Sequence, residues 1–180
     1  MSNQFQELAA QYKDEIVQTA SEMLQINSQS TQEGDFAQYV ADKMKALGYD
    51  EVVVDRYGSV FGTVHGTGGG SSVTLNCHLD VVYEGDPAKW KYPPFSGAIA
   101  EGKVWGRGAS DTKGTFAIQV YTPIILKKAG LLPKGDIVVS GVVGEEIAGF
   151  GAMMQTRDNF KLTDYCIVGE ATENDLAIGC

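Results

Sequence analysis

The chain has 180 residues, of which 43% are hydrophobic and 21% are charged, a composition typical of one soluble globular domain. Its 14 basic and 23 acidic residues give a net charge of −9, which argues against nucleic acid or an anionic membrane as the main partner. The first 12 residues are polar and lack the apolar core of a secretory signal. No apolar run approaches the roughly 18 residues of a membrane span. We therefore expect a cytoplasmic protein.

The cysteines give a second indication of the compartment. Cys77, Cys166 and Cys180 are odd in number and form no CxxC pair. Two of them lie in apolar runs, so we expect buried thiols in a reducing compartment rather than disulfides.

Two helices are expected in the first 50 residues. Apolar side chains recur at three- and four-residue steps from Phe5 to Leu24, which predicts a helical segment with one apolar stripe. The same spacing returns from Phe36 to Leu47 after a Ser/Thr/Gln-rich loop, and Gly48 follows where a helix end favours a left-handed residue. We interpret both segments as packing elements because neither carries residues typical of a catalytic site.

The pattern then changes to that of strands. Short β-rich runs at residues 52–54, 60–64 and 73–77 are separated by a turn at residues 57–58 and by a glycine-rich stretch at residues 66–72. The glycine-rich stretch could suggest a phosphate-binding loop, but it joins strand to strand and lacks the lysine of that motif. We interpret it as a hairpin turn.

The second half of the sequence alternates helices with strands. A helix is expected from about residue 112 to residue 129, ended by Gly130, and Pro123 should kink it or break its hydrogen bonds. This alternation predicts an α/β fold in which helices flank a mixed, largely parallel sheet, and residues 1–180 belong to one domain. The remaining expected elements are a strand at 137–143, a helix at 149–157, a strand at 165–168 and a final strand at 176–180.

Residues that can bind metal follow three of the expected strands, and ligands gather at the carboxyl ends of strands in open α/β sheets. Singly, a histidine after a strand is usually structural, adjacent glutamates form a solvated turn, and an aspartate before a helix caps it. Several carboxylates at one sheet edge, however, would raise one another's pKa values unless a cation were bound. The candidates are His78 and Asp80 after the strand at 73–77, Glu145 and Glu146 after 137–143, Glu170 after 165–168, and Asp111 before the helix at 112.

These residue types favour a transition metal. Imidazole with carboxylates suits zinc, cobalt or manganese better than calcium, which prefers all-oxygen ligands. An aspartate can bridge two metals about 3.5–4 Å apart. A glutamate beside a metal-binding glutamate can act as a general base on water.

The motifs and their order resemble a known family. His78-Leu79-Asp80, residues 106–114 (GRGASDTKG), Gly144-Glu145-Glu146 and Glu170 are similar to motifs of the metal-dependent peptidases and deacylases. That family includes acetylornithine deacetylase, succinyl-diaminopimelate desuccinylase, carboxypeptidase G and aminoacylase. The similarity covers nearly the whole chain. It implies a zinc-peptidase-like catalytic domain that hydrolyses amide bonds in small N-acyl amino acids or peptides.

The resemblance also implies two divalent metals, most commonly zinc, with cobalt or manganese as alternatives. It further implies a cis peptide bond between Asp111 and Thr112. By resemblance, His78 and Glu170 bind the first metal, Asp111 bridges both, Glu146 binds the second, Glu145 is the general base, and Asp80 orients His78.

Some parts that the family would require are not in this sequence. In the family, a smaller αβ domain that usually mediates homodimer formation follows, and the returning chain supplies a second metal-binding histidine. The only other histidine here, His65, matches no ligand of the family. We therefore expect the N-terminal portion of a catalytic domain, with a weakly occupied second metal site, an unpaired sheet edge and little or no activity alone.

Two other interpretations stay open. A short, non-catalytic domain for metal binding or association would take up metal without hydrolysing amides. An α/β domain with no metal would leave the same acidic residues solvated.

Overall fold

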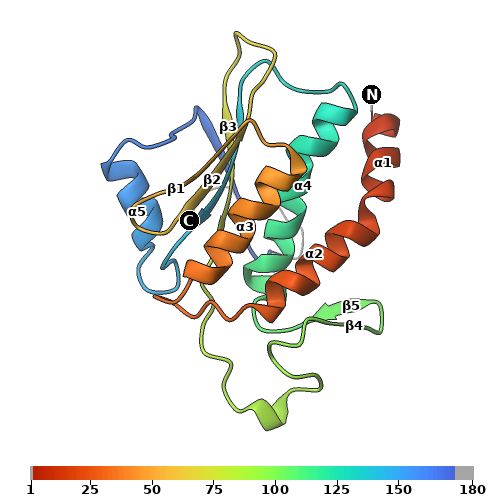
Figure 1. The fold of residues 1–180 in the computed structure, drawn as a ribbon, viewed down its shortest axis with the longest axis vertical. Coiled ribbons are helices and arrows are strands. Elements are labelled where there is room, and N and C mark those ends of the chain that lie inside the picture. The colour runs from red at the N-terminus through yellow and green to blue at the C-terminus, as the bar shows by residue number, and fades with distance from the viewer. Residues whose placement is uncertain (1, 173–180) are drawn as a thin grey trace.

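The computed structural model describes residues 2–172, and its centre is a five-stranded sheet (Figure 1). The strands are β1 (Glu51–Val54), β2 (Val60–Val64), β3 (Val73–His78), β6 (Ile137–Val142) and β7 (Tyr165–Val168). They lie in the order β1-β2-β6-β3-β7. β3 is parallel to both of its neighbours, β6 and β7, whereas β2 is antiparallel to β1 and β6. Only β2 therefore runs against the others, which confirms the predicted mixed, largely parallel sheet.

Helices cover both faces of this sheet. They are α1 (Ser2–Gln11), α2 (Lys13–Gln25), α3 (Gly34–Leu47), α4 (Gly114–Lys128) and α5 (Phe150–Arg157). α3 packs on β1 and β2, α4 packs on β3 and β6, and α1 and α2 pack on α4, while α5 lies across the sheet from them (Figure 1). The main core, between the sheet and α2 to α4, contains the fully buried side chains of Phe36, Met44, Phe116 and Tyr121.

The N-terminal apolar stripe spans two helices that meet at an angle (Figure 1). Tyr12 lies between them, and its ring packs against Tyr121 of α4 with the ring centroids 6.0 Å apart. Both helices contact α4. The three- and four-residue spacing of apolar side chains continues through the bend, because the apolar faces of both α1 and α2 pack against α4.

α4 starts two residues later than predicted and is not ended by its proline. A π-helical turn, Ala109–Lys113, comes first, and within it Asp111 has non-helical dihedral angles of φ −123° and ψ 94°. The helix includes Pro123 and continues to Lys128. The proline removes one backbone donor, and the buried Ile124 that follows it still packs in the core.

A short hairpin in the long loop before Asp111 was missed by the sequence analysis. β4 (Ala98–Ala100) pairs antiparallel with β5 (Lys103–Trp105). The two residues between them, Glu101 and Gly102, have φ values of 56° and 71°, as a two-residue hairpin turn requires. The local signal was the glycine between two short apolar runs. The hairpin packs on α2 and extends the molecule below the sheet in Figure 1.

The glycine-rich residues 66–72 do not form the predicted hairpin turn, because β6 lies between β2 and β3. The segment instead crosses the chain that enters β6. The backbone N–H of Gly68 donates to the carbonyl of Lys134 at 2.8 Å. A Cβ atom on Gly66 would lie 2.2 Å from the carbonyl oxygen of Gly135, so this crossing requires glycine.

β7 is the edge strand of the sheet in the described part of the chain, and all four of its side chains are exposed. Cys166 is therefore exposed, and the expectation of a buried thiol there was wrong, because no further strand or helix covers it in this part. Cys77 is buried, and burial raises the pKa of its thiol to about 12. Cys180 and the strand expected at 176–180 lie outside the described residues.

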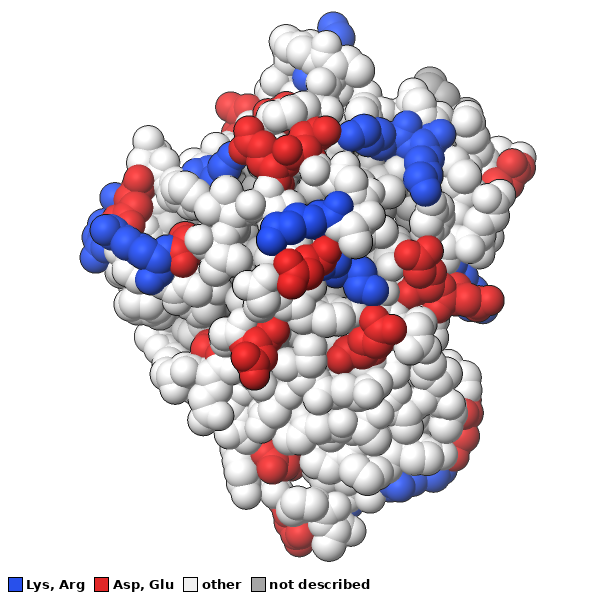
Figure 2. All heavy atoms as spheres, viewed as in Figure 1, with Lys and Arg blue, Asp and Glu red and all other residues white. Residues whose placement is uncertain are grey.

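Acidic and basic side chains are interspersed over the face that carries α3 (Figure 2). Some of them are paired, as where Lys43 of α3 contacts Glu22 of α2 at 3.2 Å. Among the described helices, none has the length and apolar character needed to cross a membrane.

The crossing of residues 66–72 can be tested by adding one methyl group. Gly66→Ala should lower the free energy of unfolding by about 1–3 kcal/mol, because the new Cβ overlaps the backbone at Gly135. Gly34→Ala is the control, since nothing lies within 4 Å of a Cβ at that helical position. Urea denaturation measures both. A Gly66→Ala protein as stable as the wild type would contradict the crossing.

Candidate metal centre

The predicted ligands meet at the carboxyl end of the sheet. His78 is the last residue of β3, Glu146 follows β6, and Asp111 comes from the π-helical turn before α4. One ligand atom from each of these three residues lies within 4.8 Å of the others. The topology thus brings together residues that are 33 to 68 positions apart in the chain, and for His78 and Glu146 their places at strand ends predicted this.

His78 is held so that one ring nitrogen is directed at the site. Its side chain is buried, and Nδ1 lies 2.9 Å from the carbonyl oxygen of Asp80. Nε2 lies 2.8 Å from Oδ1 of Asp111. Burial lowers the pKa of His78, but the hydrogen bonds with Asp80 and Asp111 outweigh it and raise that pKa to about 9. An imidazole whose Nδ1–H is bound to a carbonyl presents Nε2 as a metal ligand.

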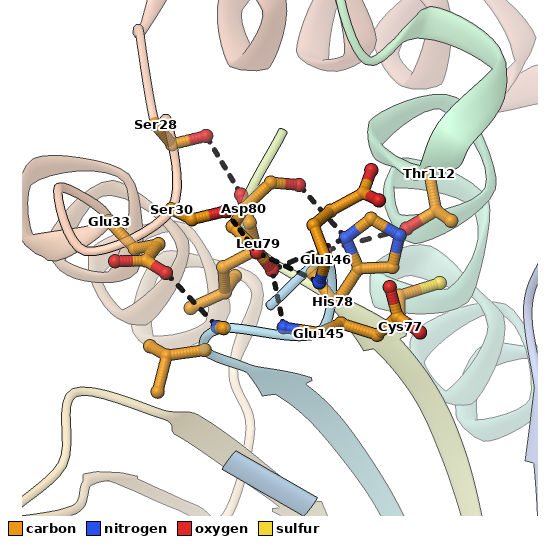
Figure 3. A network of polar contacts seen from close by, with 12 residues as sticks. Ser28, Ser30, Glu33, Cys77, His78, Leu79, Asp80, Thr112, Glu145 and Glu146 are labelled. Carbon is orange, nitrogen blue, oxygen red and sulfur yellow. Dashed lines mark hydrogen bonds and ion pairs between the residues drawn. The ribbon is translucent and has the colours of Figure 1, made fainter. Parts of the chain in front are cut away.

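Asp80 lies beside His78, between it and Ser30, and is almost fully buried (Figure 3). Its carboxylate Oδ1 is 3.6 Å from Nδ1 of His78, whereas the backbone carbonyl oxygen of Asp80 is only 2.9 Å from that nitrogen. The carboxylate accepts hydrogen bonds from Ser30 Oγ and from the backbone N–H groups of Glu145 and Glu146 (Figure 3). Burial raises the pKa of Asp80, but these bonds and the contact with His78 lower it overall. The carboxylate thus connects the ends of β3 and β6.

Asp111 takes its position from the turn that carries it. Its side chain is half-exposed, and the peptide bond to Thr112 is cis, as the resemblance implied. Lys113, two residues on, is fully buried and donates to the carbonyl oxygens of Met23 at 3.1 Å and Ile26 at 2.6 Å. Burial lowers the pKa of Lys113 to about 7. Lys113 thereby fastens this turn to the end of α2, a role that nothing in the local sequence indicates.

The carboxylates at this edge disfavour one another's ionised forms. The pKa of Glu146 is raised by burial and by repulsion from Asp111 and Glu145. The pKa of Glu170 is raised by burial and by repulsion from Asp111, with a smaller contribution from Glu145. A cation would relieve this repulsion. An imidazole nitrogen with several carboxylate oxygens is also the donor set that zinc, cobalt and manganese accept, so the residues fit a metal.

Two predicted site residues lie at the margin of this cluster. Glu170 is exposed at the end of β7 and is not within the 4.8 Å group, although its pKa responds to His78 and Asp111. Glu145 has an exposed side chain on the turn after β6. His65 lies at the other end of the sheet, where β2 ends, and contacts Asp136 at 3.2 Å.

The fold and the donor set together define the class of metal-dependent hydrolases with an α/β catalytic domain. The chain belongs to this class through peptidase family M20/M25/M40, whose family match covers residues 74–180.

Individual relatives agree with this membership. Succinyl-diaminopimelate desuccinylase of Paracoccus denitrificans is 34% identical over 164 residues, which cover 88% of this chain and 43% of that protein. An M20 family metallo-carboxypeptidase from Sulfolobus solfataricus shares the fold with a TM-score of 0.76 at 22% identity, over 86% of this chain and 37% of the other. A dinuclear metal binding peptidase of the M20 family from Bacillus subtilis has a TM-score of 0.64 at 14% identity, over 83% of this chain and 40% of the other. The chain thus spans about two-fifths of the length of these proteins.

The two histidines give a direct test of the centre. His78→Ala should abolish high-affinity zinc or cobalt binding because, among the described residues, it removes the imidazole grouped with Asp111 and Glu146. His65→Ala should leave metal binding unchanged because His65 lies at the opposite end of the sheet. Elemental analysis after dialysis against each metal measures both. Equal metal content in the two variants would place the metal elsewhere.

Proposed function

We propose that this chain carries the metal-binding part of an enzyme that hydrolyses amide bonds in N-acyl amino acids or small peptides. The observation that supports this most is the convergence of His78, Asp111 and Glu146 within 4.8 Å at the carboxyl end of the sheet. Membership of a peptidase family and similarity to a desuccinylase favour the same reaction. The chain spans about two-fifths of the length of the relatives it matches, so we place the activity in a longer protein that contains it.

In this proposal the metal ligands are His78, Asp111, Glu146 and Glu170. His78 and Glu170 would hold one ion, Glu146 would hold the other, and Asp111 would hold both. Bound divalent ions, with zinc the first candidate and cobalt or manganese the alternatives, supply Lewis-acid polarisation of the substrate carbonyl and acidification of water. Within the described residues, the second ion has only Asp111 and Glu146 as ligands, so we expect it to bind more weakly.

Glu145 is the proposed general base. It takes a proton from the attacking water and later gives that proton to the leaving amine. Its exposed side chain suits this role because it can meet water and substrate at the surface of the site. Asp80 contributes by holding the backbone N–H of Glu145 at 2.9 Å and the ring of His78 through its carbonyl.

We propose that the longer protein is a cytoplasmic homodimer that binds neither nucleic acid nor membrane.

One observation favours a second candidate. β7 is an exposed edge strand in the described part, with Tyr165 67% exposed and Ile167 57% exposed. An exposed apolar edge favours association with another chain or segment. A non-catalytic metal-binding or association domain would therefore take up metal and associate, but would not hydrolyse amides in any longer form.

Substitution of the proposed base separates these candidates. In the longer protein, Glu145→Gln should lower kcat/KM by about 10²–10⁴-fold on the best substrate of an N-acetyl, N-succinyl and dipeptide panel. The metal content should stay at the wild-type value, since Glu145 is not a proposed ligand.

Glu101→Gln is the matched control, because Glu101 is exposed on the β4–β5 turn away from the site. It should retain wild-type activity. A longer wild-type protein that binds metal but hydrolyses none of the panel would favour the association domain. Wild-type activity in Glu145→Gln would exclude Glu145 as the base.

A further inference from the structure

The chain between α2 and α3, a Ser/Thr/Gln-rich loop in sequence, runs beside the metal centre. Ser28 is fully buried, and its hydroxyl donates to the carbonyl of Leu79 at 2.8 Å. The backbone N–H of Val81 donates in return to the carbonyl of Ser28 at 3.0 Å. The segment is thus tied to the residues on either side of Asp80 (Figure 3).

Ser30 acts on the carboxylate of Asp80. Its hydroxyl donates to Oδ2 at 2.8 Å, the same oxygen that accepts the backbone N–H of Glu146 at 3.1 Å. Oδ1 accepts the backbone N–H of Glu145 at 2.9 Å. A hydrogen bond from Ser30 restricts the rotation of the carboxylate, so both oxygens stay in line with these two backbone donors.

Glu33 binds the backbone of Gly144, the residue that precedes Glu145 and Glu146. Its side chain is only 5% exposed, and Oε1 accepts the backbone N–H of Gly144 at 3.0 Å. Glu33 is the N-cap residue of α3, yet its side chain does not cap that helix. None of the ion pairs in the described part of the chain involves it. Its carboxylate therefore interacts with the turn after β6.

Three consecutive backbone N–H groups, those of Gly144, Glu145 and Glu146, are each bound by a carboxylate from another part of the chain. Gly144 has a φ of 63°, so the backbone reverses at this point. These three amides are held by Glu33 and Asp80, and the side chains of Glu145 and Glu146 extend on the side of His78 (Figure 3).

We propose that Ser30 and Glu33 are positioning residues for the metal centre, because they hold the Gly144–Glu146 turn through Asp80 and through Gly144 directly. The inference rests on the proposed function, since Glu146 is a proposed ligand and Glu145 the proposed base. Their hydrogen bonds go to Asp80 and to the backbone of Gly144, and not to a proposed metal ligand. They act by fixing the backbone from which those two side chains extend.

The test uses Co²⁺ as the probe, because its visible absorption reports the number and geometry of its ligands. Glu33→Met removes the acceptor for Gly144 at similar size, and Ser30→Ala removes the donor to Asp80. Each should weaken Co²⁺ binding about 10- to 100-fold and change the absorption spectrum. Glu33→Gln keeps an acceptor oxygen and should restore affinity and spectrum to nearly wild-type values.

Tyr49→Phe is the matched control for a general loss of stability. It removes a buried side-chain-to-backbone bond of 2.7 Å, from Tyr49 to the carbonyl of Val120, far from the turn. It should lower the melting temperature and leave Co²⁺ binding unchanged. Circular dichroism measures the thermal unfolding of each variant, and all Co²⁺ titrations are made below the temperature at which unfolding begins. If Glu33→Met does not fold, Ser30→Ala decides the test.

The outcomes separate the two levels of the proposal. A wild-type chain that binds no Co²⁺ would overturn the proposed function and this inference with it. Wild-type binding with the same affinity and spectrum in Ser30→Ala and Glu33→Met would overturn the inference alone. Weakened binding in both variants, with Glu33→Gln and Tyr49→Phe unaffected, would support it.

Discussion

The buried carboxylate of Asp80 is the contact on which the arrangement of the metal centre depends. It carries a negative charge into a position that is almost inaccessible to water, where an ionised group is stable only if several donors surround it. Those donors come from the loop before α3 and from the turn after β6. One side chain therefore fixes the distance between two strand ends, and with it the positions of the proposed ligands on those ends.

The proposed carboxylate ligands differ from Asp80, because their negative charges lie close together and repel one another. Glu146 and Glu170 both have raised pKa values, through burial and through repulsion from Asp111 and Glu145. Such a cluster is held together by the backbone around it and not by its own interactions. The buried contacts of Asp80 and Lys113 supply that support from outside the cluster. The stabilising hydrogen bonds thus lie beneath the site, and the destabilising repulsion lies where a cation would bind.

The rest of the fold is arranged around the same edge of the sheet. The crossing of residues 66–72 over the entry to β6 lets β6 lie between β2 and β3. That order puts the end of β6, with its two glutamates, directly beside His78 at the end of β3. β7 then places Glu170 on the far side of β3 and leaves its own outer edge without a neighbour in the described part.

The sequence by itself determined most elements and the choice of candidate metal ligands. Period-2 and period-3.6 patterns depend on neighbours in the chain, so the strands of the main sheet and most helix bounds could be predicted locally, whereas the short β4–β5 hairpin was missed. His78 and Glu146 could be chosen because ligands at strand ends meet at one edge of a parallel sheet. Asp111 follows no strand, and it was chosen for its place before a helix and by the family resemblance. Glu145 and Glu170 rested on the strand-end argument and on the family resemblance.

Only the tertiary structure decided which strands are neighbours and what supports the ligands. Local pattern made residues 66–72 a hairpin turn, because nothing in that stretch reveals that a strand 70 residues later lies between its ends. Ser30, Glu33 and Lys113 likewise resemble ordinary polar residues in sequence. Their roles arise from hydrogen bonds to residues 50 to 111 positions away, and such contacts exist only once the chain has folded.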